Sequence, residues 1–148
     1  MRKWQIESEE DTKRLAGALA SIASSGISIG LQGGLGAGKT TLVRYLVERL
    51  GGSTTEVASP TYTLHHEYSL SGGMILDHWD LYRLNALPVE LDQQPSSGTI
   101  RIIEWPERCP DLLASLDLIL TMRVVAESSR DVMIEGRLAE DLFSSANL

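Results

Sequence analysis

The stretch GGLGAGKTTLVR, residues 33–44, decides how the rest of the sequence is interpreted. From Gly33 to Thr40 it follows the Walker A pattern of phosphate-binding loops, G-x4-G-K-T. The apolar run ISIGL at 27–31 predicts a strand before it, and the leucines of TTLVRYLVERL at 40–50 recur at the spacing of a helix face. Strand, glycine loop and helix in this order predict a site for a nucleotide phosphate; the alternative is a glycine-rich turn without a ligand.

Each position of the pattern has a physical role in holding phosphate. Glycines let successive backbone N–H groups turn toward one anion, and a helix that begins at Lys39 or Thr40 presents the positive end of its dipole. Lys39 can reach the β- and γ-phosphates, and the Thr40 hydroxyl can bind Mg²⁺. The residues expected at the phosphates are Gly34, Leu35, Gly36, Ala37, Gly38, Lys39, Thr40 and Thr41.

Two carboxylates at predicted strand ends are candidates for the chemistry. Asp80 ends the apolar-rich stretch MILDHWD, and Glu104 lies at the end of TIRIIEW. Ligands of α/β sheets bind at the carboxyl ends of the strands, so Asp80 would lie near Mg²⁺, while Glu104 could bind the metal or orient a water. The alternative is a pair of ordinary solvated side chains. With Lys39 they form the expected catalytic set, and with Thr40 the expected metal ligands.

The remaining patterns predict one α/β domain over residues 1–148. We expect a mixed, mainly parallel sheet flanked by helices and closed by an antiparallel hairpin. Residues 85–98 read as a surface loop, and residues 143–148 as a frayed end. The other expected elements are a helix from the N-cap Ser8 to about Ser24, strands at 63–70, 74–81 and 99–105, and a hairpin of 116–125 with 131–138.

Composition restricts the partners and the compartment. A formal net charge of −7 disfavours a broad surface for nucleic acid, so direct binding of RNA or DNA is not expected. The N-terminus does not resemble a secretory signal, and no apolar run approaches the roughly 18 residues of a membrane helix. We therefore expect a cytoplasmic protein without a membrane segment.

Three side chains on predicted strands receive no chemical role. His65 and His66 are adjacent, so they point to opposite faces of a strand and cannot bind one zinc ion together. Arg101 is expected to be a surface charge whose removal does little.

Four motifs in order carry a family resemblance. SPTYTL at 59–64, HWDLYRL at 78–84 and IIEWPER at 102–108 follow the GGLGAGKTT loop in this short chain. Together they closely resemble the TsaE family of small P-loop ATPases in bacterial tRNA threonylcarbamoyladenosine synthesis, over roughly residues 8–136. One departure from the family lies between HWDLYRL and IIEWPER, where the segment is shorter here than is usual.

The resemblance implies a compact P-loop domain that binds ATP or ADP with Mg²⁺ and hydrolyses ATP slowly. It also implies association with TsaB and TsaD, the pair that modifies an adenosine beside the tRNA anticodon, and hydrolysis that resets this assembly. Contact with tRNA would then be indirect.

The resemblance also implies particular site residues. Thr61 would sense the γ-phosphate from a switch-like loop, Trp105 would support the Glu104 loop, and Asp80 would be the Walker B-like carboxylate. More weakly, it suggests nucleotide contacts by Glu9 or Thr12 and by Arg130.

Two other functions remain open at this point. A small-molecule kinase would also need a phosphate loop and magnesium, but the chain has only three lysines and no arginine cluster resembling a lid. A nucleotide-gated interaction module without useful turnover has less need of both Asp80 and Glu104.

Overall fold

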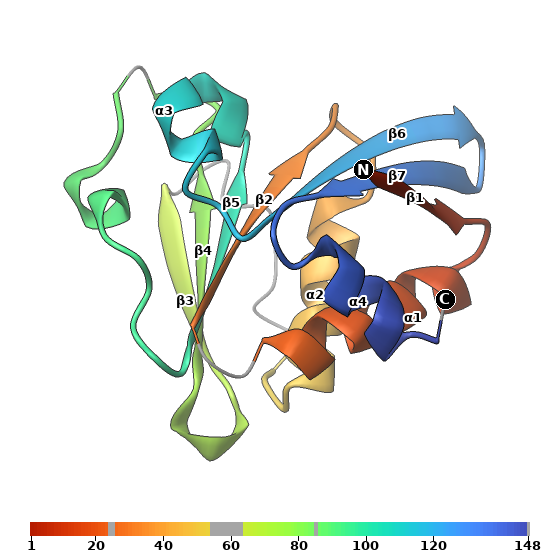
Figure 1. Cartoon of the computed structure of the whole chain (residues 1–148), viewed down its shortest axis with the longest axis horizontal. Helices are drawn as coiled ribbons and strands as arrows, with labels where there is room; N and C mark the ends of the chain where they lie inside the picture. Colours follow the sequence, from red (N-terminus) through yellow and green to blue (C-terminus); the bar gives the residue numbers. More distant parts are fainter. Residues whose placement is uncertain (24–25, 54–63, 85, 148) are drawn as a thin grey trace.

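A seven-stranded mixed sheet forms the centre of the protein (Figure 1). The structure is a computed structural model, and it describes residues 1–23, 26–53, 64–84 and 86–147. The strands are arranged in the order β1-β7-β6-β2-β5-β4-β3. Their bounds are β1 Arg2–Ile6, β2 Ile27–Gln32, β3 His65–Ser69, β4 Ile75–Asp80, β5 Thr99–Glu104, β6 Leu118–Ala126 and β7 Ser129–Glu135. The α-helices are α1 Glu9–Ile22, α2 Lys39–Arg49, α3 Pro110–Leu113 and α4 Ala139–Ser145, and the short 3₁₀ turns are η3 Ser71–Gly73, η4 Val89–Asp92 and η5 Pro106–Arg108.

The centre of the sheet is parallel and its edges are antiparallel. Strand β2 pairs in parallel with β6 and β5, and β5 pairs in parallel with β4. The β7 and β1 strands continue one edge in antiparallel pairs, and β3 pairs antiparallel with β4 at the other. The α/β fold with a mixed sheet and a C-terminal hairpin is therefore confirmed. Because β2, β4 and β5 run in the same direction, their carboxyl ends meet at one edge of the sheet.

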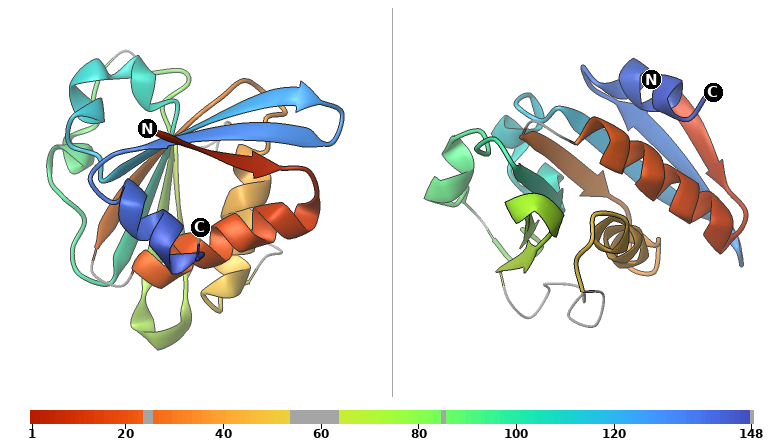
Figure 2. Two further views of the ribbon diagram at one scale, coloured as in Figure 1. Left: turned by 45° about the vertical axis from the view of Figure 1, so that its right-hand side comes forward. Right: turned by 90° about the horizontal axis from the view of Figure 1, so that it is seen from below.

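Helices α1, α2 and α4 cover one face of the sheet (Figures 1 and 2). Their apolar faces join alternate residues of the central strands in the main core, which includes Leu15, Leu42, Ile29, Ile102 and Phe143. A smaller cluster on the other face lies beneath η4, η5 and α3; it contains Trp79, Leu81, Leu91, Ile103, Cys109, Leu112 and Leu116. Among the described helices, none combines the length and apolar composition that crossing a membrane requires.

The ends of α1 follow from local sequence. Ser8 is its N-cap, with a side chain that accepts a hydrogen bond from the backbone N–H of Asp11. Acidic residues then fill the first turn, where they complement the helix dipole. The predicted start of this helix is confirmed.

Both chain ends differ from the sequence prediction. The first residues form β1, which pairs with β7 in a register that places Trp4 opposite Val132. The expected frayed end at 143–148 is wrong for the described residues up to 147, because α4 extends to Ser145 and Phe143 is only 1% exposed. The Phe143 ring lies 5.6 Å from the Trp4 ring, so the two termini hold each other in place.

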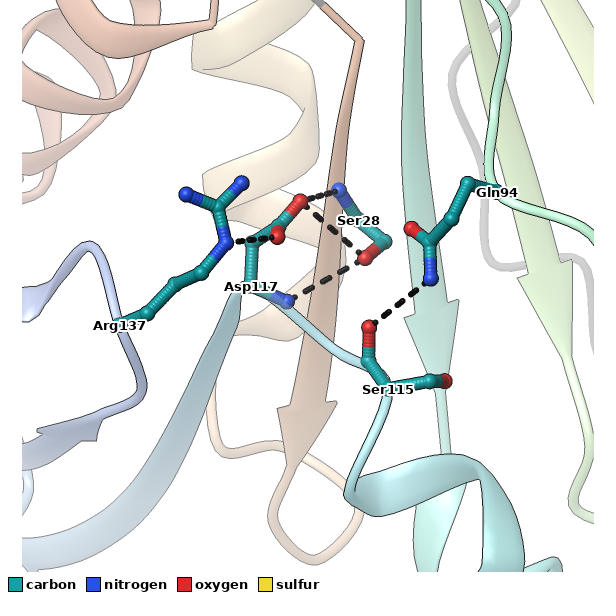
Figure 3. A network of polar contacts seen from close by, with 5 residues as sticks. All are labelled: Ser28, Gln94, Ser115, Asp117 and Arg137. Carbon is teal, nitrogen blue, oxygen red and sulfur yellow. Dashed lines mark hydrogen bonds and ion pairs between the residues drawn. The ribbon is translucent and has the colours of Figure 1, made fainter.

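A polar cluster joins strand ends at the opposite edge from the glycine loop (Figure 3). One carboxylate oxygen of Asp117 accepts the Ser28 backbone N–H at 2.9 Å, and the other accepts Arg137 Nε at 2.7 Å. The Asp117 N–H in turn donates to the Ser28 carbonyl at 3.0 Å. Nearby, Gln94 Nε2 donates to the Ser115 carbonyl at 3.2 Å. The bonds between Asp117 and Ser28 lie where β2 and β6 begin to pair, so they help to fix the register of the two strands.

Candidate functional site

The loop of residues 33–38, hereafter the glycine loop, leaves β2 and enters the first turn of α2. Gly36 and Gly38 have backbone φ angles of 77° and 103°, which residues with a Cβ atom rarely adopt. An added Cβ at Gly34 or Gly36 would meet nothing within 4 Å, so this side of the loop is open. The loop therefore brings an accessible backbone and the positive end of an 11-residue helix to one place, an arrangement suited to an anion.

Lys39 lies behind the loop and is only 6% exposed. Its Nζ donates to the Gly33 carbonyl at 2.7 Å, and lies 3.9 Å from Glu104 Oε1 and 4.1 Å from the centre of the Trp105 ring. Burial lowers the pKa of Lys39 below its usual 10.5, although the carboxylates of Glu104, Asp80 and Glu107 act in the opposite direction. An anion beside this ammonium would therefore be stabilising.

The two predicted carboxylates lie side by side. Asp80 and Glu104 end their strands as register partners, and both are almost fully buried, at 5% and 2% exposure. Asp80 Oδ1 accepts the backbone N–H of Tyr82 at 2.9 Å, which turns the chain away from the sheet. Both side chains therefore lie at the carboxyl ends of adjacent parallel strands, and Glu104 also lines the hollow at the glycine loop.

Trp105 forms a wall next to Glu104. Its backbone adopts φ 60° and ψ 45°, a left-handed conformation that is uncommon for a residue other than glycine. Its N–H donates to the Leu31 carbonyl at 3.2 Å, and its ring lies between Lys39 and the Tyr82 ring, 4.9 Å from the latter. Trp105 therefore couples the ends of β2 and β5 and shields Lys39 from water.

Two adjoining hollows surround the glycine loop. The larger, of about 530 Å³, is lined by Leu35, Gly36, Ala37, Gly38, Lys39, Thr40, Thr41, Glu104, Trp105 and Arg130. The smaller, of about 210 Å³, shares Ala37, Gly38, Thr41 and Arg130 and adds Ile6, Ser8, Glu9, Thr12, Met122 and Ser128. A separate hollow of about 480 Å³ between α1 and α4 contains none of the motif residues.

Most of the predicted contacts are therefore brought together. Glu9 and Thr12 at the start of α1 lie across the smaller hollow from the glycine loop. Arg130 joins both hollows, with Nη2 donating to the Gly36 carbonyl at 3.4 Å. Thr61 lies outside the described residues.

The oxygen-bearing side chains near the glycine loop would suit Mg²⁺, which is bound by few protein groups together with phosphate and water. They would not suit a metal that is bound by protein side chains alone. Among the described residues, no three His, Cys, Asp or Glu side chains are close enough to hold a metal ion. Thr40, Asp80 and Glu104 would supply hard oxygen ligands, leaving room for phosphate oxygens and water, as Mg²⁺ prefers.

Sequence reasoning missed one residue of the site. His78 is fully buried, and its Nε2 lies 2.6 Å from Glu104 Oε2. The sequence held a signal for it, because side chains of a strand alternate between two faces. His78 and Asp80 lie two positions apart on β4 and therefore share a face.

Arg101 lies on the opposite face of the same strands, and the expectation that it is a surface charge is wrong. This side chain is only 11% exposed, donates through Nε to Asp77 Oδ2 at 3.0 Å, and donates through Nη1 to the Gln93 carbonyl at 2.6 Å. Asp77 also bonds His65, whose ring stacks on Trp79. Arg101 is thus part of a nearly buried polar network, not a surface charge.

Comparison with known proteins identifies the family. The family model described as Threonylcarbamoyl adenosine biosynthesis protein TsaE matches residues 6–132, a span that contains the glycine loop, Asp80, Glu104 and Arg130. The chain belongs to the TsaE family. TsaE proteins, as the family description states, take part in threonylcarbamoyladenosine biosynthesis.

Individual relatives of the TsaE family agree with the model match. The chain is 48% identical over 101 residues to the tRNA threonylcarbamoyladenosine biosynthesis protein TsaE of Synechocystis sp., covering 64% of this chain and 63% of that protein. It is 38% identical over 131 residues to the protein of the same name from Aquifex aeolicus, covering 87% and 92%. The crystal structure of Bacillus subtilis YdiB superposes with a TM-score of 0.71 at 25% identity, covering 99% of this chain and 93% of that one.

Proposed function

We propose that this chain is an Mg²⁺-dependent ATPase that acts as an accessory component of tRNA threonylcarbamoyladenosine synthesis. The observation that carries the proposal is the convergence of the glycine loop, Lys39 and Glu104 on one hollow in a member of the TsaE family. A site for a phosphate chain needs backbone donors, a cation and a metal-binding carboxylate in this arrangement.

Each group has a role in the proposed site. The amides of residues 34–41 and the start of α2 bind the phosphates, and Lys39 neutralises charge on the β- and γ-phosphates. Thr40, Asp80 and Glu104 hold Mg²⁺, which when bound offsets the charge of the phosphate oxygens during transfer. Glu104 also orients the attacking water. Thr61 senses the γ-phosphate.

The rim of the site contacts the nucleoside. Glu9, Thr12 and Arg130 line the smaller hollow, where Ile6 and Met122 offer apolar surface to a base. Trp105 closes the other side of the phosphate site and excludes water from Lys39. This assignment gives ATP or ADP a polar end beside Glu104 and an apolar end beside Met122.

The proposed partners are the TsaB and TsaD homologues of the same cell, in the cytoplasm. Hydrolysis would reset their assembly between turnovers, and tRNA would be contacted only through the complex. The net charge of −7 supports a protein partner over a nucleic acid, because a broad phosphate-binding surface would need excess positive charge.

ATP hydrolysis by the purified chain, alone and with its TsaB and TsaD, tests the proposal. Turnover should depend on Lys39, so Lys39→Ala controls for contaminating ATPase, and the rate should rise with the partners. Transfer of phosphate to a small acceptor would replace the proposal with a kinase. Nucleotide binding without turnover in either condition would replace it with a nucleotide-gated interaction module.

A further inference from the structure

His78 begins the HWDLYRL motif, but no role in phosphate or metal binding has been assigned to it above. Its side chain is fully buried in β4, and its Nε2 lies 2.6 Å from Glu104 Oε2 on the neighbouring strand. Among the described residues, His78 Nδ1 has no hydrogen-bond partner. Its ring lies tilted beside the Tyr68 ring, with centroids 6.2 Å apart. The bond to Glu104 is therefore the polar contact that gives this imidazole its orientation.

The chemistry of the pair sets the direction of the bond. A carboxylate accepts hydrogen bonds, so the tautomer that fits this contact has the N–H at Nε2, which donates a hydrogen bond to Glu104 Oε2. The remaining Nδ1 of a neutral ring is then a lone pair, which is less costly to bury unpaired than an N–H donor. A short bond from a buried donor to a carboxylate is also stronger than a neutral bond.

The position of Lys39 shows what this bond prevents. Lys39 Nζ is 3.9 Å from Glu104 Oε1, which is too long for a hydrogen bond, and it donates to the Gly33 carbonyl instead. Two opposite charges this deeply buried attract each other strongly. With Oε2 bonded to His78, Oε1 is the oxygen of this hollow-lining side chain that is left without that bond, and it stays 3.9 Å from the ammonium.

We propose that His78 is a positioning residue that anchors one oxygen of Glu104, so that the other is available to Mg²⁺ and the nucleotide. The inference rests on the proposed function. Partners that orient a metal-binding carboxylate typically change metal affinity by about 10- to 100-fold when they are removed. A residue that only fills the core would instead change stability, or change nucleotide and metal binding together.

Two amide substitutions separate these roles. The amide nitrogen of His78→Gln lies near the position of Nε2 and can donate to Glu104, whereas the shorter His78→Asn reaches only about as far as Nδ1. His65→Gln is the matched control, because His65 also bonds a carboxylate, Asp77, but on the opposite face of the same strands. The readouts are calorimetric affinity for ADP without metal, the Mg²⁺ concentration that gives half-maximal ATP binding, and the melting temperature.

We expect His78→Asn to raise the half-maximal Mg²⁺ concentration by about 10- to 100-fold while leaving metal-free ADP affinity unchanged. His78→Gln should recover most of the Mg²⁺ affinity, and His65→Gln should match the wild type.

Equal Mg²⁺ dependence in His78→Asn and His78→Gln would overturn the inference, as would a parallel loss of metal-free ADP affinity. If His78→Asn does not fold, His78→Gln alone decides, since wild-type Mg²⁺ affinity supports anchoring and a 10-fold loss or more, about the lower bound for such partners, refutes it. A wild-type chain that binds no nucleotide would refute the proposed function itself, whichever way His78 behaves.

Discussion

At the scale of single residues, Lys39 has the most unusual environment in the site. Its pKa lies below 10.5 because burial disfavours the charged form, whereas the proposed binding of phosphate needs that charge. We expect metal-free ADP affinity to be full below the pKa of Lys39 and to fall as the pH rises through it, before 10.5 is reached. In Lys39→Met the affinity should be weak throughout and lack this fall.

The same shift has a consequence for folding stability. Over the window between the lowered pKa and 10.5, the unfolded chain retains a proton that folded Lys39 has released, so the nucleotide-free protein gains stability with rising pH. Urea denaturation of the wild type should show this rise relative to Lys39→Met. Identical pH profiles would contradict a lowered pKa.

Glu104 separates binding from hydrolysis at this scale. Glu104→Gln keeps the shape and can still accept from His78 through its amide oxygen, but it loses the charge that, in the proposed function, would activate water and hold Mg²⁺. We expect ADP to bind without metal as in the wild type, while the rate of ATP hydrolysis falls by about 100-fold or more. Turnover measured in partner-stimulated assays checks this, and near-normal turnover would remove Glu104 from the catalytic set.

At the scale of elements, strand ends far from the site are fixed by Asp117. Asp117→Ala leaves the buried Ser28 N–H without its acceptor, which should lower the free energy of unfolding by about 1–3 kcal/mol. Glu140→Ala is the control, because its ion pair with Arg2 is exposed and should change stability by less than about 1 kcal/mol. ADP affinity should be unaltered in both, and a selective loss in Asp117→Ala would show that this end controls the glycine loop.

The terminal helix α4 is the second element-scale case. Phe143 packs against Trp4 and beneath the Arg2 guanidinium, which lies 3.9 Å from its ring centre. Phe143→Ala should therefore cost about 3–5 kcal/mol of folding stability, as expected for a buried aromatic. Urea unfolding measures it; a loss below 1 kcal/mol, about the range of a surface substitution, would mean that α4 contributes little to the core.

At the scale of the whole molecule, the site connects elements from most of the chain. The start of α1, the glycine loop, the end of β5 and the β6–β7 turn all line its hollows, and the end of β4 lies beside the end of β5. A nucleotide that binds only the folded chain should stabilise it by about 2.7 kcal/mol at 100 times its dissociation constant. We expect Mg²⁺-ADP to raise the melting temperature of the wild type and of Asp117→Ala, but not of Lys39→Ala.

Features controlled by neighbouring residues were open to prediction from the sequence. The glycine loop, the start of α1 at Ser8 and the central strands follow from spacing, capping and alternation within about 15 residues. The strand-end positions of Asp80 and Glu104 were predictable because each follows an apolar run. Their closeness followed from the rule that parallel strands bring their carboxyl ends together. The roles of Glu9, Thr12 and Arg130 came from family resemblance alone, because neither region has a local motif.

Only the tertiary structure decided which distant side chains meet. The bond between His78 and Glu104 spans 26 positions and depends on β4 lying beside β5 in one register. Arg101 likewise meets Asp77 only because β4 and β5 pair in a register that sets the two opposite each other, with the Gln93 carbonyl beside them. The two termini form β1 and α4, which pack together through Trp4 and Phe143. Burying this apolar surface stabilises both segments, and neither could bury it alone. The sequence by itself therefore determined the glycine-loop motif, because its residues are neighbours in the chain, and the sheet order decided the buried contacts of Glu104, because its partners are not.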